Sequence, residues 1–198
     1  VSFTVSRNLK SAEKLAKKIR INSYSDQLKN IPVNKGIFFL TLPDSQIKIA
    51  ADDLSKLKLN FKESLFVHFS GAENTELLKP LEKNGALTAS FHIMQTFPST
   101  RIVNIKNCYA AIETPNDNAE KILNKIAGDL ELRPLQIKPD SKVYYHLAGV
   151  FASNFLAANL FASEKIFEKT GNKKEEFYKV YKSIIKQTLK NIKKEGPA

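Results

Sequence analysis

Residues 36–57 read GIFFLTLPDSQIKIAADDLSKL, a short apolar run followed by a proline and then a helical pattern. Residues 36–41 are apolar almost throughout, which is typical of a strand covered on both faces of a sheet. Pro43 suits the start of a helix, with Asp44 or Ser45 in its first turn. The apolar residues that follow recur at helical spacing and predict a buried stripe: Ile47, Ala50, Ala51, Leu54 and Leu57. This stretch therefore predicts a strand–turn–helix unit.

Similar units lie on both sides of this stretch. The strand-like residues 1–5 precede a helix that Asn8 or Ser11 can cap. Further strands are predicted at 65–69, 87–91, 108–112 and 132–137, and further helices at 76–83 and 118–130. Strands and helices that alternate at these lengths predict an α/β fold, with a mostly parallel sheet and helices on its faces.

The character of the sequence changes after Pro139. Residues 140–170 contain no proline and one glycine, and they predict a helix about thirty residues long that is apolar on several faces. A second helix is predicted at 175–194. We therefore expect a domain boundary at residue 139, between an α/β domain and an all-helical domain. Residues 144–167 carry more apolar surface than two helices can cover, so we expect a homodimer built through the helical domain.

Composition and charge exclude several classes of protein. No apolar run approaches the ~20 residues that span a bilayer, and no signal segment opens the chain, so no membrane association is expected. A single cysteine, Cys108, predicts no internal disulfide and no metal cluster, and favours the cytoplasm. The net charge is +11, but the lysines are scattered over helix faces beside acidic residues, so a solvated surface is favoured over a nucleic-acid groove.

Ser6, Arg7 and Asn8 directly follow the first predicted strand. In dinucleotide-binding sheets the residues after the second strand meet the adenosine ribose, where an acidic residue suits NAD and a basic one suits the 2′-phosphate of NADP. No acidic residue occurs here until Glu13. A guanidinium can donate two parallel hydrogen bonds to a phosphate. The alternative, that these residues are only a polar turn between strand and helix, stays open.

Five stretches resemble, in order, a dehydrogenase-like family that includes pyrroline-5-carboxylate reductase and ketopantoate reductase. They are FFLTLPDSQI (38–47), VHFSGA (67–72), SFHIMQTFP (90–98), YAAIET (109–114) and YYHLAGVFASNFL (144–156). Together they resemble Rossmann-like proteins that have a helical C-terminal domain of unassigned function and are related to 6-phosphogluconate dehydrogenase. The resemblance implies a Rossmann-like dinucleotide-binding domain at 1–139 and a helical dimerisation or substrate domain at 140–198.

The sequence departs from this family in two places. Members begin with a strand and a Gly-x-Gly-x-x-Gly turn that holds the pyrophosphate, and no such glycine pattern occurs here. We therefore expect the first domain to be incomplete at its N-terminus by one strand–turn–helix, and the second to be incomplete at its C-terminus. His92-Ile93 stands where relatives usually have His-Pro, so that turn is expected to be less rigid.

The resemblance also implies where a cofactor and a substrate bind. NADP contacts are expected from three turns: Ser6, Arg7 and Asn8; Thr41, Leu42, Pro43 and Asp44; and Ser70 and Gly71. In the related 3-hydroxyacid dehydrogenases, a lysine and an asparagine one helical turn apart face the nicotinamide. Asn154 is present here, but Val150 precedes it by one turn, so no lysine is expected to play that part.

His146 precedes Ser153 by seven residues on the same predicted helix, a rotation of ~700° that brings them nearly into register. We expect His146 to donate a proton to the substrate, with Asn154 holding the substrate oxygen. His92 is expected to be a further catalytic residue, and Gln95 and Ser153 are expected to contact the substrate. The alternatives are that His146 bonds to Tyr144, Tyr145 or the sheet, and that His92 is structural. His68 is expected to serve packing, and Glu113 either orients a partner or is an exposed strand end.

Three functions are compatible with these observations. The first is an NADP-dependent oxidoreductase that reduces a small carbonyl or imine compound in a cleft between the two domains. The second is a non-catalytic dinucleotide-binding or regulatory protein of the same fold, favoured by the absent lysine. A nucleic-acid-associated protein is favoured by charge alone. No metal-ligand spacing and no nucleophilic triad occurs in the sequence.

Overall fold

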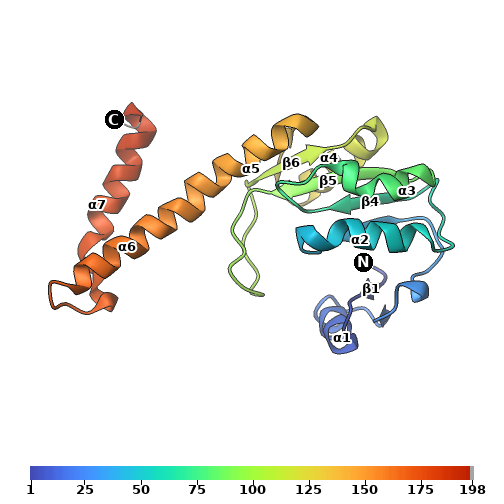
Figure 1. The fold of residues 1–198 in the computed structure, drawn as a ribbon, viewed down its shortest axis with the longest axis horizontal. Helices are drawn as coiled ribbons and strands as arrows, with labels where there is room; N and C mark the ends of the chain where they lie inside the picture. The colour runs from blue at the N-terminus through green and yellow to red at the C-terminus, as the bar shows by residue number, and fades with distance from the viewer. Residues whose placement is uncertain (197–198) are drawn as a thin grey trace. The chain divides into compact units, whose positions relative to one another are not determined.

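The computed structural model describes residues 1–196, and the chain divides into two compact units that meet at His146 and Leu147. The first unit contains a five-stranded sheet of order β3-β4-β5-β6-β7 and a two-stranded parallel sheet, β1-β2 (Figure 1). The strands are β1 (Thr4–Val5), β2 (Tyr24–Ser25), β3 (Ile37–Leu40), β4 (Leu65–His68), β5 (Leu87–Ile93), β6 (Tyr109–Glu113) and β7 (Arg133–Gln136). All neighbouring strands run parallel except the pair β5 and β6. The predicted α/β class with a mostly parallel sheet is confirmed.

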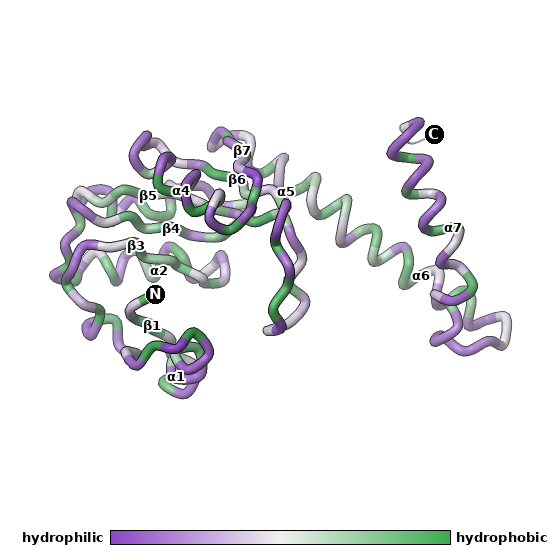
Figure 2. The backbone as a smooth tube through the Cα atoms, turned by 180° about the vertical axis from the view of Figure 1, so that it is seen from behind, coloured by the Kyte–Doolittle hydropathy of each residue, from purple (hydrophilic) through white to green (hydrophobic). Residues whose placement is uncertain are grey.

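Helices cover both faces of the five-stranded sheet. On one face, α4 (Asp117–Asp129) packs against β4, β5 and β6 through residues such as Leu123, Val67 and Ile112. On the other face lie α2 (Asp44–Ser55), α3 (Lys79–Lys83) and the 3₁₀ turn η2 (Thr75–Leu78), around Phe66. Successive residues of β4 thus point to opposite helical layers, because side chains alternate across a strand. Figure 2 shows the hydrophobic residues gathered along the strands of this sheet.

One expectation about β3 is wrong. The sequence predicted that residues 36–41 are covered on both faces, but Ile37 is 43% and Phe39 is 44% exposed. The reason is position: β3 is at the edge of the five-stranded sheet, and the layer formed by α4 packs on the strands from β4 onward. The ring of Phe39 meets that of Phe69 edge to face, at 5.5 Å between centroids.

The helix α1 (Leu9–Lys18) begins as the sequence predicted. Of the two candidate caps, Asn8 takes the role: its Oδ1 accepts hydrogen bonds from the backbone N–H groups of Lys10 and Ser11, at 2.9 and 3.4 Å. The helix buries only its two alanines, Ala12 and Ala16. The short 3₁₀ turn η1 (Leu28–Asn30) follows β2.

Helices make up the rest of the chain. A 3₁₀ turn, η3 (Pro139–Ser141), leads into α5 (Lys142–Val150), and the last residues of the first unit lie on this helix. The second unit holds the π-helical turn η4 (Phe151–Phe155), α6 (Leu156–Glu168) and the mostly hydrophilic α7 (Lys174–Glu195) (Figure 2). Phe167 and Phe177 form its small core. No helix within residues 1–196 combines the length and the apolar character needed to cross a bilayer.

Candidate functional site

Side chains from β5 and α5 gather over the turn that follows β4. Gly71 lies in this turn, His92 lies near the end of β5, and His146 lies on the second turn of α5. The rings of His92 and His146 stand 6.4 Å apart between centroids. Because β4 and β5 are parallel, their carboxyl ends meet at one edge of the sheet, which is where ligands bind in open α/β sheets.

Gly71 makes this gathering possible because it has no side chain. A Cβ atom at this position would lie 2.7 Å from Nδ1 of His146 and 2.8 Å from Nε2 of His92. Contacts shorter than 3.0 Å are not tolerated between such atoms, so any larger residue would displace one or both imidazoles. The role of this glycine is therefore to leave space for two imidazole rings.

His92 is held by the hydroxyl of Tyr145. Nδ1 of His92 lies 3.1 Å from the Tyr145 hydroxyl oxygen, and the two rings meet edge to face. Burial lowers the pKa of His92 to about 4, and the positive charges of Lys142 and His146 act in the same direction. Burial also raises the pKa of Tyr145 to about 12. At neutral pH, a neutral imidazole is therefore paired with an intact phenol.

Lys142 is the functional candidate that the sequence did not reveal. Its side chain is buried, with 2% of the residue surface exposed, and its Nζ donates hydrogen bonds to the carbonyl oxygen of Ser70, at 3.1 Å, and to the hydroxyl of Ser90. Burial lowers the pKa of Lys142 to about 8, while the carboxylates of Glu113, Asp44 and Glu73 oppose that shift. One weak signal was present in the sequence, a lysine at the start of an otherwise apolar helix.

His68 and Glu113 support the same region from inside the fold. His68 is fully buried: its Nδ1 accepts from the backbone N–H of Ser70 and its Nε2 lies 3.2 Å from the carbonyl oxygen of Asn74. Burial, with Lys142 second, lowers the pKa of His68 to about 4. Glu113 is buried rather than an exposed strand end, and it accepts from the backbone N–H and the hydroxyl of Thr75, at 2.9 and 2.7 Å. It orients Thr75 at the start of η2.

Of the expected cofactor residues, six lie at one sheet edge. Thr41, Leu42, Pro43 and Asp44 follow β3 and are exposed, and Ser70 and Gly71 follow the parallel neighbour β4. The Ser70 hydroxyl accepts from the backbone N–H groups of Ala72 and Glu73, at 3.2 and 3.0 Å, and so shapes its own turn.

Ser6, Arg7 and Asn8 follow β1 in the two-stranded sheet. Asn8 caps α1, as described, while Arg7 is exposed and forms no ion pair with any residue between 1 and 196. A hydroxyl and an unpaired guanidinium at the start of a helix are donors of the kind that a phosphate requires.

Three expected site residues remain: Gln95, Ser153 and Asn154. Gln95 is in the loop after β5, where its Nε2 lies 3.5 Å from the carbonyl oxygen of Asn104 and its Oε1 accepts from the backbone N–H of Thr96. Ser153 and Asn154 belong to the second unit, and the Ser153 hydroxyl donates to Oδ1 of Asn154, at 3.3 Å. Their assignment to substrate binding and catalysis stays a prediction.

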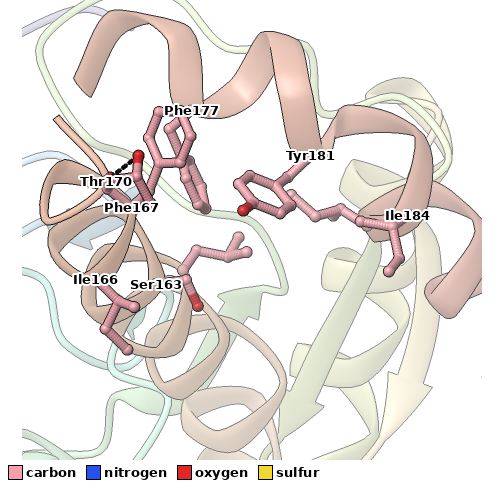
Figure 3. A pocket seen from close by; sticks show the side chains of 9 residues that line it. Ser163, Ile166, Phe167, Thr170, Phe177, Tyr181 and Ile184 are labelled. Atoms are coloured by element: carbon pink, nitrogen blue, oxygen red, sulfur yellow. Dashed lines mark hydrogen bonds between the residues drawn. The ribbon is translucent and has the colours of Figure 1, made fainter. Parts of the chain in front are cut away.

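The second unit has an apolar groove of about 320 Å³ between α6 and α7 (Figure 3). The rings of Phe167, Phe177 and Tyr181 pack together there, as Figure 3 shows. Thr170 donates its hydroxyl to the carbonyl oxygen of Phe167, at 2.7 Å, and Ser163 donates to that of Asn159, at 2.9 Å. These two hydroxyls are used within the helices, and Tyr181 is the other polar residue of an otherwise apolar lining. The groove therefore lacks the several convergent polar groups of a catalytic site. Among residues 1–196 no group of His, Cys, Asp or Glu is arranged to hold a metal ion.

Residues 108–198 match a family described as a domain of unknown function, DUF2520. None of the curated proteins matches the chain significantly. Among solved structures, the chain is similar to BF3122 from Bacteroides fragilis, provisionally described as an NADP oxidoreductase. The two share 23% identity and a TM-score of 0.78, over 99% of this chain and 72% of that one.

Two further structures are similar over almost the whole chain. A reductive aminase from Aspergillus terreus, in complex with NADPH and ethyl-5-oxohexanoate, has 11% identity and a TM-score of 0.74, over 96% of this chain and 66% of that one. A pyrroline-5-carboxylate reductase from Coxiella burnetii has 12% identity and a TM-score of 0.66, over 99% and 71%. The chain has a Rossmann-like fold. The predicted resemblance in fold is thereby confirmed, and at these identities the likeness concerns the fold alone.

Proposed function

We propose that the chain is an NADP-dependent oxidoreductase that transfers a hydride to a small carbonyl or imine substrate. The observation that carries this proposal is the pair of imidazoles over Gly71, at the carboxyl ends of β4 and β5. This edge of the sheet is the ligand-binding edge of the fold, and an imidazole is suited to giving a proton near neutral pH. The solved neighbour with bound NADPH supports the choice of cofactor.

The chain's own residues would hold the cofactor at two places. Arg7 and Ser6 would bind the 2′-phosphate of the adenosine ribose, because a guanidinium matches the geometry of phosphate oxygens. The turns 41–44 and 70–71 would line the nicotinamide side. When bound, NADPH supplies the hydride.

His146 is the proton donor in this proposal, and His92 has a supporting role. The pKa of His92 is about 4, so this side chain is neutral at pH 7 and has no proton to give as an acid. Its ring is held by the Tyr145 hydroxyl and lies edge to face with that of His146, 6.4 Å away between centroids. Asn154, Ser153 and Gln95 remain predicted substrate residues, with Asn154 expected to hold the substrate oxygen.

A homodimer through the helical residues is also part of the proposal, together with a domain boundary at residue 139 and a cytoplasmic location. Large apolar side chains of the second unit are exposed: Leu147, Phe151, Phe155, Phe161, Ile166 and Ile184. Apolar surface on this scale is typical of an interface. Light scattering at micromolar concentration should give the mass of a dimer, and a monomeric mass contradicts this part.

The test of the function is a fluorescence titration of the whole chain with NADPH and with NADH, followed by turnover assays on small carbonyl and imine compounds. We expect NADPH to bind more tightly and its oxidation to depend on the second substrate. Equal affinity for the two cofactors contradicts the NADP assignment. Tight binding without turnover supports the second candidate, a non-catalytic dinucleotide-binding protein, which Val150 favours because related dehydrogenases carry a lysine there.

A further inference from the structure

We propose that Lys142 is the positioning residue of the candidate site, fastening α5 to the turn after β4 and to β5. The proposal rests on the proposed function for its catalytic consequence, but its geometric content concerns the folded chain alone.

The two acceptors of Lys142 are neighbours of two site residues. Its Nζ donates to the carbonyl oxygen of Ser70, which is joined by one peptide bond to Gly71. It also donates to the hydroxyl of Ser90, which lies two residues before His92 on β5 and therefore on the same face of the strand. The Ser90 hydroxyl in turn donates to the same Ser70 carbonyl, at 3.3 Å.

The lysine itself stands one helical turn before the third site residue. His146 is four residues after Lys142 on α5, and Tyr145 is three residues after it, so all three share one face of the helix. One ammonium group therefore joins the three elements that carry Gly71, His92 and His146. Its hydrogen bonds hold these elements together at the short distances between Gly71 and the two imidazoles.

Lys142 does not act on a substrate directly. Lys142 is 2% exposed and Ser90 is fully buried, so neither the amine nor the hydroxyl can reach a reacting atom, although a serine–lysine pair resembles an activated nucleophile. Burying an ammonium is also costly, and an apolar side chain of the same length would fill the space at lower cost. A positioning role accounts for a cation at this place.

The charge of Lys142 reaches the histidines as well. It lowers the pKa of His68, on β4, and of His92, on β5. The other charged or titratable groups that act on this centre are Glu73 in the turn after β4, Glu113 on β6, Asp44 on α2, and Tyr145 and His146 on α5. Removing the ammonium should therefore raise the pKa of both buried histidines, while their burial stays.

The test compares Lys142→Met, Lys142→Arg and the control Lys138→Met in the whole chain. Met keeps the length of the side chain, and the Ser90 hydroxyl can still donate to Ser70, so the fold should survive. Lys138 is exposed four residues earlier. The first readout is the titration of the imidazole ring protons by NMR, which needs no substrate.

We expect Lys142→Met to raise the pKa of His92 by roughly 0.5–1 unit. In Lys142→Arg the positive charge is present again, so the pKa should stay close to its wild-type value. Once a substrate that is turned over has been identified, kcat should fall roughly 10–100-fold in Lys142→Met, because a catalytic group is misplaced. The KM for NADPH should stay constant. The control should match the wild type in both readouts.

Unchanged histidine titrations in Lys142→Met overturn the positioning role. If Lys142→Met does not fold, Ser90→Ala tests the same network, since it removes one acceptor and keeps the cation; the proposal then requires altered His92 ring resonances. A wild-type protein that neither binds NADPH nor turns over a substrate defeats the proposed function, whereas the NMR titrations still decide the role of Lys142.

Discussion

Two groups of polar residues in the first unit differ in how the fold holds them. Ser6, Arg7 and Asn8 form a turn in which Ser6 is half-buried, while Arg7 is exposed and has no ion-pair partner within residues 1–196. The cluster of His92, Lys142 and His146 is built from two elements and packed over a third. An exposed turn can bind a charged ligand with little reorganisation of the fold, whereas the packed cluster fixes the positions of groups that carry out chemistry.

The largest expected effect is at His146, in the packed cluster. His146→Gln should lower kcat roughly 10²–10⁴-fold, the usual range for loss of a general acid, and leave NADPH affinity nearly unchanged. Steady-state kinetics and a fluorescence titration measure the two quantities. Tyr144→Phe is the matched control, because Tyr144 is 72% exposed on the same helix. Full activity in His146→Gln refutes this role.

The buried histidines should make the fold sensitive to acid. The pKa of His68 is about 4 in the folded chain, below the ordinary 6.5, so the unfolded chain binds more protons between these values. Stability should therefore fall as the pH drops from 6.5 to 4, by on the order of 3 kcal/mol for His68. Urea denaturation at pH 7 and pH 4.5 measures the change. In His68→Gln the loss between the two pH values should be smaller; an equal loss assigns it to carboxylates instead.

Gly71→Ala tests whether the space over the turn matters. The added methyl group would meet both imidazoles at less than 3.0 Å, so the free energy of unfolding should fall by roughly 1–3 kcal/mol. Gly128→Ala is a sharp control, because that glycine lies inside α4 with nothing within 4 Å of the added atom. It should stabilise the chain by up to about 1 kcal/mol. Thermal denaturation measures both changes. Equal changes in stability for Gly71→Ala and Gly128→Ala would contradict the claim that the space over Gly71 is needed.

The smallest expected effect is on the exposed turn. Arg7→Asp should weaken NADPH binding roughly tenfold or somewhat more, the contribution of one charge-assisted contact, and leave stability within about 0.5 kcal/mol. Lys14→Asp changes the charge of α1 equally at an exposed position away from the turn. Fluorescence titration of both variants with NADPH shows whether the loss of affinity is specific to Arg7. If both lose the same affinity, the effect belongs to the overall charge and not to Arg7.

The sequence predicted local structure well, because local structure depends on neighbouring residues. The strands from residues 36–41 to 132–137, the cap at Asn8 and the helical C-terminal region follow from hydrophobic period and turn chemistry. The prediction that β3 is covered on both faces was wrong because it, too, relied on local sequence. An apolar run does not indicate whether a strand is central or at the edge of a sheet.

The candidate site depends on contacts that no local pattern contains. Gly71 and His146 are far apart in the sequence, and their contact needs the order of the strands and the start of α5. Lys142 was missed for a related reason. A lysine on a helix is normally exposed, and its burial becomes visible only when the acceptors Ser70 and Ser90 are placed around it.

The buried ammonium also affects how the protein would respond to directed evolution. A selection for thermal tolerance should enrich apolar residues at position 142, because replacing a buried charge by an apolar side chain of similar volume is often neutral or stabilising. A selection for turnover should keep the lysine. Libraries sorted by the two criteria should therefore differ at position 142, because stability and catalysis favour different residues at this buried position.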